Sequence, residues 1–125
     1  HPARIRHGDV LAIAAEGSAE GRAFDVILLD VDNGPEPLSA PGNAALYGAG
    51  GLGTLRRALT PDGILMVWSA FEDPDFIARA RSAGFFPASL PVFRAGRAEP
   101  FHLVYVLSAW PFPPDELDRL GLQPL

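Results

Sequence analysis

Two carboxylates lie at the end of a strongly apolar segment of this 125-residue chain. Asp30 directly follows the block 24–29 of a predicted strand over 23–31. Asp32 follows in a loop that also contains Pro35. Because the block shows no alternation of apolar and polar residues, it is typical of a strand buried on both faces. Ligands of open α/β sheets bind beyond the carboxyl ends of such strands, so Asp30 is a candidate ligand contact. The alternative is that Asp30 caps the loop.

Other acids are expected at the same edge of the sheet. Asp9 follows a short predicted strand, and Glu72 and Asp73 follow the apolar block 64–68. These carboxylates predict an acidic cleft, which favours a cationic or amine-bearing ligand, or one that donates hydrogen bonds, over a phosphate. A structural role competes for Asp9, because it stands where the N-cap of a helix over 10–15 would lie.

Structural roles are the favoured interpretation of several further residues. Asp32 beside Asn33 is typical of a turn. Tyr47 and Trp68 have apolar neighbours, which predicts core positions for both. His102 is a lone histidine in a predicted strand, and a packing role is favoured for it over a ligand role.

Strands and helices are expected to alternate along the chain. The predicted strands cover 3–7, 23–31, 64–68, 85–93 and 101–107, and the predicted helices cover 10–15, 46–59, 75–82 and 115–120. The turn Ala95-Gly96-Arg97 predicts an antiparallel hairpin between the last two strands. The sequence Thr60-Pro61-Asp62-Gly63 is expected to end the second helix. This order predicts one α/β domain over 1–125, with a mostly parallel sheet and an antiparallel C-terminal hairpin.

The composition excludes several classes of function. The chain has no cysteine and three histidines, so disulfides and thiolate sites are excluded and no metal site is expected. A net charge of −5 opposes binding of nucleic acid. No apolar stretch has the length of a membrane span or the form of a secretion signal, so we expect no membrane partner and a cytoplasmic location. A small-molecule ligand fits this composition best.

Three segments carry a resemblance to a known family. They are Arg4-Ile5-Arg6-His7-Gly8-Asp9-Val10, Phe24 to Asp30, and Leu59-Thr60-Pro61-Asp62-Gly63-Ile64-Leu65. Together they resemble the later part of a spermidine synthase-like protein. The resemblance implies the Rossmann-like fold of class I S-adenosylmethionine-dependent methyltransferases. It also implies that the chain binds S-adenosylmethionine or its decarboxylated form, without a metal, and transfers a methyl or aminopropyl group to a small molecule such as an amine.

The resemblance assigns roles to individual residues. Asp9 would accept a hydrogen bond from the adenine amine, with Val10 beside the adenine ring. The loop from Asp30 to Pro35 would complete the adenine side of the site. Asp30 would also lie near the sulfonium and the incoming amine, where a carboxylate stabilises the positive charge. These implied contacts make Asp30 the central residue of the expected site.

Two departures from the family's pattern bear on function. The family has a second aspartate three residues after the first, and this chain has Asn33 there, which cannot act as a base. Asp32, one residue out of register, is the nearest catalytic candidate. No Gly-x-Gly-x-Gly loop follows a predicted strand, so the chain resembles the family's domain without its first strands. The first departure favours a methyltransferase-like or divergent member over a spermidine synthase.

The missing strands imply an exposed apolar edge of the sheet, and such edges recruit another chain. We therefore expect either a homo-oligomer or a missing N-terminal segment that covers the edge. Two functions stay open on these grounds. One is a transferase of the S-adenosylmethionine class, and the other is a non-catalytic dimerising or partner-binding scaffold derived from the same fold.

Overall fold

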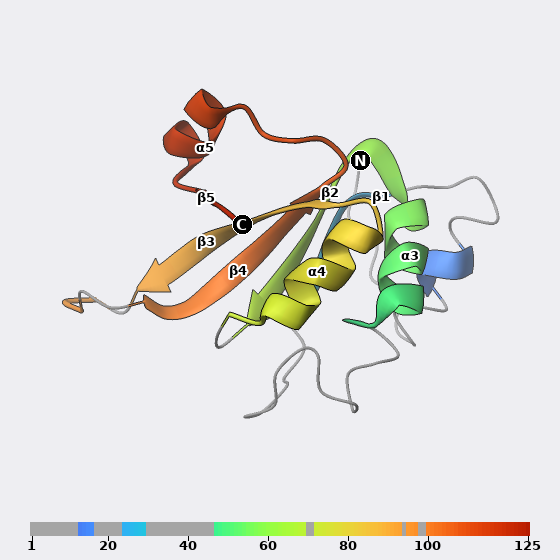
Figure 1. The fold of residues 1–125 in the computed structure, drawn as a ribbon, viewed down its shortest axis with the longest axis horizontal. Coiled ribbons are helices and arrows are strands. Elements are labelled where there is room, and N and C mark those ends of the chain that lie inside the picture. Colours follow the sequence, from blue (N-terminus) through green and yellow to red (C-terminus); the bar gives the residue numbers. More distant parts are fainter. Residues whose placement is uncertain (1–12, 17–23, 30–46, 70–71, 94, 98–99) are drawn as a thin grey trace, which may run out of the picture.

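Helices and strands alternate along the chain in a computed structural model that describes residues 13–16, 24–29, 47–69, 72–93, 95–97 and 100–125 (Figure 1). In chain order the elements are β1 (Phe24–Leu29), α3 (Ala49–Ala58), β2 (Leu59–Ser69), α4 (Pro74–Ser82), β3 (Phe86–Phe93), β4 (Pro100–Ser108), α5 (Pro114–Leu120) and β5 (Gln123–Pro124). Residues 13–16 are also helical. In Figure 1, α3 and α4 lie beside each other over the sheet, and α5 lies apart from them near β3 and β5.

The strands form one sheet in the order β1-β2-β4-β3-β5. β1 pairs with β2 in parallel, β4 pairs antiparallel with both β2 and β3, and β3 pairs antiparallel with β5. The antiparallel pairings outnumber the parallel one within the described residues because the hairpin strand β4 inserts between β2 and β3. This arrangement confirms the predicted Rossmann-like α/β fold class with its antiparallel C-terminal hairpin. The two-residue strand β5 was not predicted.

The start of β2 corrects the predicted boundary between helix and strand. We predicted a helix over 46–59 that ends at a turn over 60–63, whereas α3 ends at Ala58 and β2 begins with Leu59. The predicted turn instead lies inside the strand. Leu59 pairs with Phe24 and Ile64 pairs with Val26, so four residues of β2 lie opposite one residue of β1, Asp25. The pairing of the two strands is therefore irregular there.

Two residue types explain this irregularity. Pro61 has no N–H and cannot join a regular hydrogen-bond ladder. A Cβ atom at Gly63 would lie 3.0 Å from the carbonyl oxygen of Phe24, so only glycine lets the backbones approach this closely. The Thr60 hydroxyl donates a hydrogen bond of 3.1 Å to Asp25 Oδ1 across the irregular segment. The Thr-Pro-Asp-Gly sequence therefore shapes the strand and does not interrupt it.

The core lies between the sheet and helices α3 and α4. Alternate residues of the central strands, such as Val67 and Tyr105, are fully buried on this face. Leu52 and Leu55 of α3 pack against them, which confirms the predicted helical spacing of these leucines. Tyr47 is also fully buried, as predicted.

The ends of the later elements follow the local sequence. Gly84 ends α4 at φ +96°, as predicted, and Gly121 ends α5 at φ +71°. Gly96 of the predicted hairpin turn has φ +77°. A residue with a Cβ atom would be strained in these left-handed conformations, so glycine is favoured at all three positions.

Candidate functional site

The parallel pair β1 and β2 places two strand ends at the same edge of the sheet. Leu29, the last residue of β1, is in register with Val67, and β2 continues to Ser69. Leu29 and Ser69 are both buried. In an open α/β sheet this carboxyl edge is where ligands bind, so it is the candidate site.

The residues predicted for this site from the sequence are Asp9, Val10, Asp30, Asp32 and Pro35, and all of them lie outside the described residues. The predicted strand over 3–7 lies outside them as well. Asp30 is the next residue in the sequence after Leu29. The roles of these residues therefore remain predictions.

Asp73, one of the acids predicted to line the cleft, has a structural role. It is the N-cap of α4, and its Oδ1 accepts a hydrogen bond of 3.3 Å from the backbone N–H of Phe76. Its own backbone N–H donates a hydrogen bond of 2.7 Å to the hydroxyl of Tyr105. Asp73 is buried, whereas the neighbouring Glu72 is exposed. Of these two acids, only Glu72 offers its carboxylate to solvent at this edge.

An aromatic cluster supports the start of α4. The rings of Phe76 and Tyr105 are 4.9 Å apart, and the rings of Tyr47 and Phe76 are 5.8 Å apart at 84°. Such tilted and edge-to-face pairs stabilise a core beyond the area they bury. All three side chains are fully buried, so the cluster holds the segment between β2 and α4 in a fixed position.

The hydroxyl of Tyr105 is not a base at neutral pH. Burial raises the pKa of Tyr105 from 10.0 to about 12, and the nearby charges of Asp73 and Glu72 also raise it. The hydrogen bond from the Asp73 backbone acts in the opposite direction but does not offset burial. Tyr105 therefore serves as a neutral hydrogen-bond acceptor that positions Asp73.

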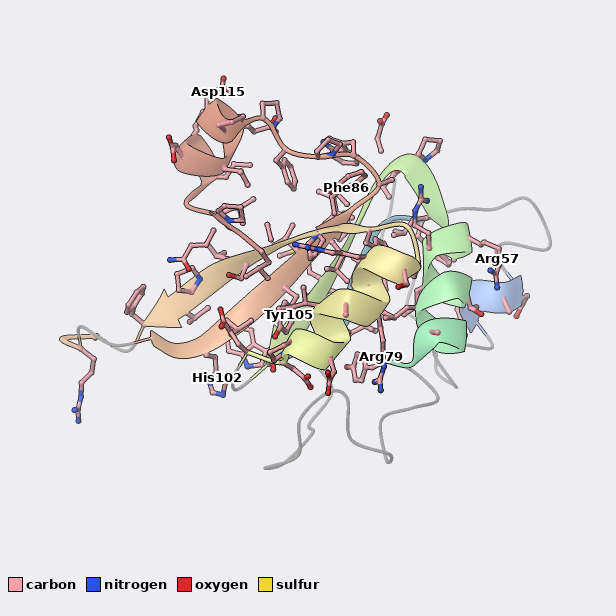
Figure 2. All side chains as sticks on the ribbon, in the orientation of Figure 1. Arg57, Arg79, Phe86, His102, Tyr105 and Asp115 are labelled. Atoms are coloured by element: carbon pink, nitrogen blue, oxygen red, sulfur yellow. The ribbon has the colours of Figure 1, made fainter. Side chains whose placement is uncertain are left out.

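A second aromatic pair lies at the same edge on the other face of the sheet. Trp68 of β2 is in register with Val104 of β4, which brings the Trp68 ring to 5.2 Å from the ring of His102. Both side chains are half-buried. The packing role predicted for His102 is consistent with this ring contact, but Trp68 is less buried than the predicted core position implied. Sequence reasoning missed their proximity, because only the register of the hairpin against β2 shows it. Figure 2 shows His102 and Tyr105 near this end of the sheet and Arg79 on α4.

The described residues were compared with two patterns, a metal-ligand group and a membrane-spanning helix. No group of three or more histidine or acidic side chains there has the arrangement of a metal site. None of the helices in the described ranges is long and apolar enough to cross a membrane.

A hollow lies at the opposite end of the strands. It has a volume of about 490 Å³ and is lined by apolar side chains of β3 and the C-terminal segment, with Arg81 as the charged residue. Phe86, at this hollow, is in register with Ser108, which pairs with Ile64 in the middle of β2, away from the carboxyl end at Ser69. The hollow is therefore separate from the carboxyl edge and does not extend the candidate site.

Comparison with known proteins bears on the fold. A solved structure of human methyltransferase-like protein 13 in complex with SAH is similar, with a TM-score of 0.68 and 20% sequence identity. The similarity covers 93% of this chain and 55% of that one. The chain has a methyltransferase fold. It spans about half the length of that protein. No family model matches the sequence, and no curated protein matches it.

Proposed function

We propose that the chain is part of an S-adenosylmethionine-dependent methyltransferase that acts on a small molecule. The observation that carries the proposal is the similarity to a methyltransferase-like protein in complex with SAH. When bound, S-adenosylmethionine supplies an electrophilic methyl group on a positively charged sulfur. The side chains of this edge would bind and orient it, and positioning of this kind accounts for much of the rate of group transfer.

The described residues of the carboxyl edge fit an adenosyl group in two respects. Trp68 offers half-buried aromatic surface, and Glu72 offers an exposed carboxylate that accepts hydrogen bonds. The sequence adds Asp30 directly after β1, where a carboxylate would stabilise the sulfonium charge. Asp9 and Val10 would bind the adenine, and the loop to Pro35 would complete the adenine side of the site.

The proposal favours methyl transfer over aminopropyl transfer. Asn33 stands where the spermidine synthase-like pattern has its second aspartate, and an amide cannot take the proton of an attacking amine. Asp32 is the remaining candidate for that role. A preference for the decarboxylated form of the cofactor would reverse this assignment.

Isothermal titration of the chain with S-adenosylmethionine and with SAH tests the proposal. We expect saturable binding of both, and we expect Asp30→Asn to weaken it by about tenfold or more, a change of about 1.4 kcal/mol. Asp62→Asn is the matched control, because Asp62 is exposed and lies near the amino end of β2, away from the site. A folded chain that binds neither compound would contradict the proposal for this chain.

Tryptophan fluorescence locates the binding site independently. The chain has two tryptophans, Trp68 at the carboxyl edge and Trp110 after β4. We expect a ligand-dependent fluorescence change that Trp68→Phe removes and Trp110→Phe retains. The reverse result would place the ligand away from the carboxyl edge.

One observation favours a second candidate, the non-catalytic scaffold. The side chains of Val26 and Leu28 in β1 are 58% and 63% exposed, and exposed apolar side chains of this kind are typical of a surface that binds another polypeptide. A scaffold would bind a partner through β1 and show no affinity for S-adenosylmethionine.

A further inference from the structure

The hollow beside the start of β3 has a volume of about 490 Å³ and is bordered by two parts of the chain. Residues 86–88 of β3 supply one wall, and residues between 111 and 125 supply the other. We call this space the C-terminal hollow. Its volume lies within the range of small-molecule sites, about 300–1,000 Å³, and is far larger than the gaps that packing leaves inside a protein. In Figure 1 the segment after β4 arches over β3 on its way through α5 to β5.

Hydrogen bonds hold the arching segment at both of its ends. At its start, the hydroxyl of the fully buried Ser108 donates a hydrogen bond of 2.6 Å to the Trp110 carbonyl. At its far end, the Leu125 N–H donates one of 3.3 Å to the Pro87 carbonyl of β3. The walls of the C-terminal hollow are therefore in place without a ligand, and a preformed site loses less entropy when it binds one.

Apolar side chains make up most of the surface of the C-terminal hollow. Phe86 is 46% exposed there, although it belongs to a strand whose next three residues are buried. Phe112 and Leu117 on the other wall are half-buried. The ring of Phe112 also contacts the ring of Trp110 at 5.6 Å, which restrains it. An apolar ligand would remove this surface from water, which favours its binding.

Positive charge lies beside this apolar surface. Arg81 is the one charged residue among the described residues that line the C-terminal hollow. It is exposed, and its guanidinium forms no ion pair or hydrogen bond within the described part of the chain. A second guanidinium, that of Arg56, lies 6.0 Å from the centre of the Phe85 ring, which also lines the hollow. Charge complementarity therefore favours a ligand with a negative group.

We propose that the C-terminal hollow binds a small molecule that has an apolar body and one carboxylate group. The body would lie against Phe86 and Phe112, and the carboxylate would accept hydrogen bonds from Arg81. The planar fork of a guanidinium matches a carboxylate in shape and in charge. A phosphate group carries more charge than the one lining guanidinium balances. Because the hollow is separate from the carboxyl edge, this inference does not rest on the proposed methyltransferase function.

Tryptophan fluorescence tests whether a ligand of this class binds at the C-terminal hollow. The probe is phenylbutyrate, which has an aromatic body and one carboxylate. We expect a saturable change at submillimolar concentrations that Trp110→Phe removes and Trp68→Phe retains, because Trp110 contacts Phe112 of the hollow wall. This is the reverse of the pattern expected for S-adenosylmethionine. A folded chain that does not bind phenylbutyrate, or a change that depends on Trp68, would overturn the proposal.

The role of the charge is tested with a neutral ligand and two arginine variants. Phenylbutyramide has the shape of phenylbutyrate without its charge, and we expect it to bind more weakly. We expect Arg81→Gln to reduce the affinity for phenylbutyrate about fivefold, the upper range for an exposed ion pair, and to leave the affinity for phenylbutyramide unchanged. Arg97→Gln is the matched control, because Arg97 is exposed after the other end of β3 and should change neither affinity.

Replacing Phe86 tests the apolar wall separately from the charge. Phe86→Ala removes exposed aromatic surface, and we expect it to weaken the binding of both compounds by a similar factor while the circular dichroism spectrum stays unchanged. Equal affinity of the natural chain for the acid and the amide would overturn the assignment of an anionic ligand. Unchanged binding of both compounds in Phe86→Ala would overturn the placement of the ligand in the hollow.

Discussion

The two edges of this sheet are built in opposite ways. At one edge, β3 is covered by the short strand β5, and the Leu125 N–H donates a hydrogen bond of 3.3 Å to the Pro87 carbonyl. At the other edge, β1 presents Val26 and Leu28 to solvent. The hairpin side is closed by the C-terminal strand β5, whereas no described strand pairs with the outer side of β1.

This difference bears on both the fold and the candidate site. The closed side contains the local hairpin, which the chain completes by itself. The open side contains the parallel pair whose carboxyl edge is the candidate site, and β1 leads directly to Asp30. The strand that leads to the candidate site is thus also the strand whose outer side has no neighbour among the described strands.

The largest expected contrast is between two leucines at the two sides. Leu107 of β4 is fully buried and Leu28 of β1 is 63% exposed. We expect Leu107→Ala to reduce the free energy of unfolding by about 2–5 kcal/mol, because it leaves a cavity. We expect Leu28→Ala to change it by less than about 0.5 kcal/mol. Urea denaturation at low protein concentration measures both, and equal losses would contradict the assignment of an open edge.

Replacing Tyr105 tests the support of the carboxyl edge. Tyr105→Phe removes the acceptor for the buried Asp73 N–H, and we expect a loss of about 1–3 kcal/mol. The variant also tests pH dependence. Because the pKa of Tyr105 is raised from 10.0 to about 12 by folding, its contribution is complete below pH 10 and is lost as the pH rises towards 12. Across this pH range we expect the free energy of unfolding to decline less in Tyr105→Phe than in the natural chain. An equal decline in both proteins would show that Tyr105 does not cause it.

Replacing Asp73 and Asp75 one at a time distinguishes the effect of a helix cap on stability from that of a surface charge. Asp73→Ala removes the N-cap of α4, with an expected loss of about 1 kcal/mol. Asp75→Ala removes an exposed charge in the first turn, and we expect a loss of only about 0.3–0.5 kcal/mol. Equal effects in thermal denaturation would mean that Asp73 is not needed as a cap.

Two glycines are expected to shift stability in opposite directions. Gly121 has φ +71° at the end of α5, so Gly121→Ala should cost about 1 kcal/mol. Gly50 lies in α3 with nothing within 4 Å of a Cβ atom, so Gly50→Ala should gain about 0.5–1 kcal/mol. In thermal denaturation we expect the melting temperature to fall in Gly121→Ala and to rise in Gly50→Ala. A loss from Gly50→Ala would contradict the helical conformation at that position.

The sequence predicted the elements whose signals are local. The hairpin around Gly96, helix α4 with its glycine stop at Gly84, and α5 with proline in its first turn all agree with the structure. Periodicity, turn residues and caps act over a few positions, so one sequence is enough to find them.

Features that depend on distant segments were not predicted. Residues 60–63 resemble a turn, but the pairings of Leu59 and Ile64 with β1 on either side of them place them inside β2. β5 forms only because β3 lies beside it, and two residues carry no periodicity. The contact between Trp68 and His102 depends on the register of β4 against β2.

The candidate site was predictable in position but not in detail. An apolar strand block followed by Asp30 located the carboxyl edge, because that rule depends on fold class alone. The prediction that this strand is buried on both faces was wrong, since Val26 and Leu28 are exposed on one face of β1. Asp73 fitted the same rule and is a helix cap. Residue type and spacing therefore did not separate a cap from a ligand contact at this edge.

Amide hydrogen exchange tests the contrast between β1 and the central strands most directly. We predict that amides of β4, which is paired on both sides, are strongly protected. Outward-facing amides of β1 should exchange fast, because no described strand pairs with them. Equal protection of β1 and β4 would contradict the open edge.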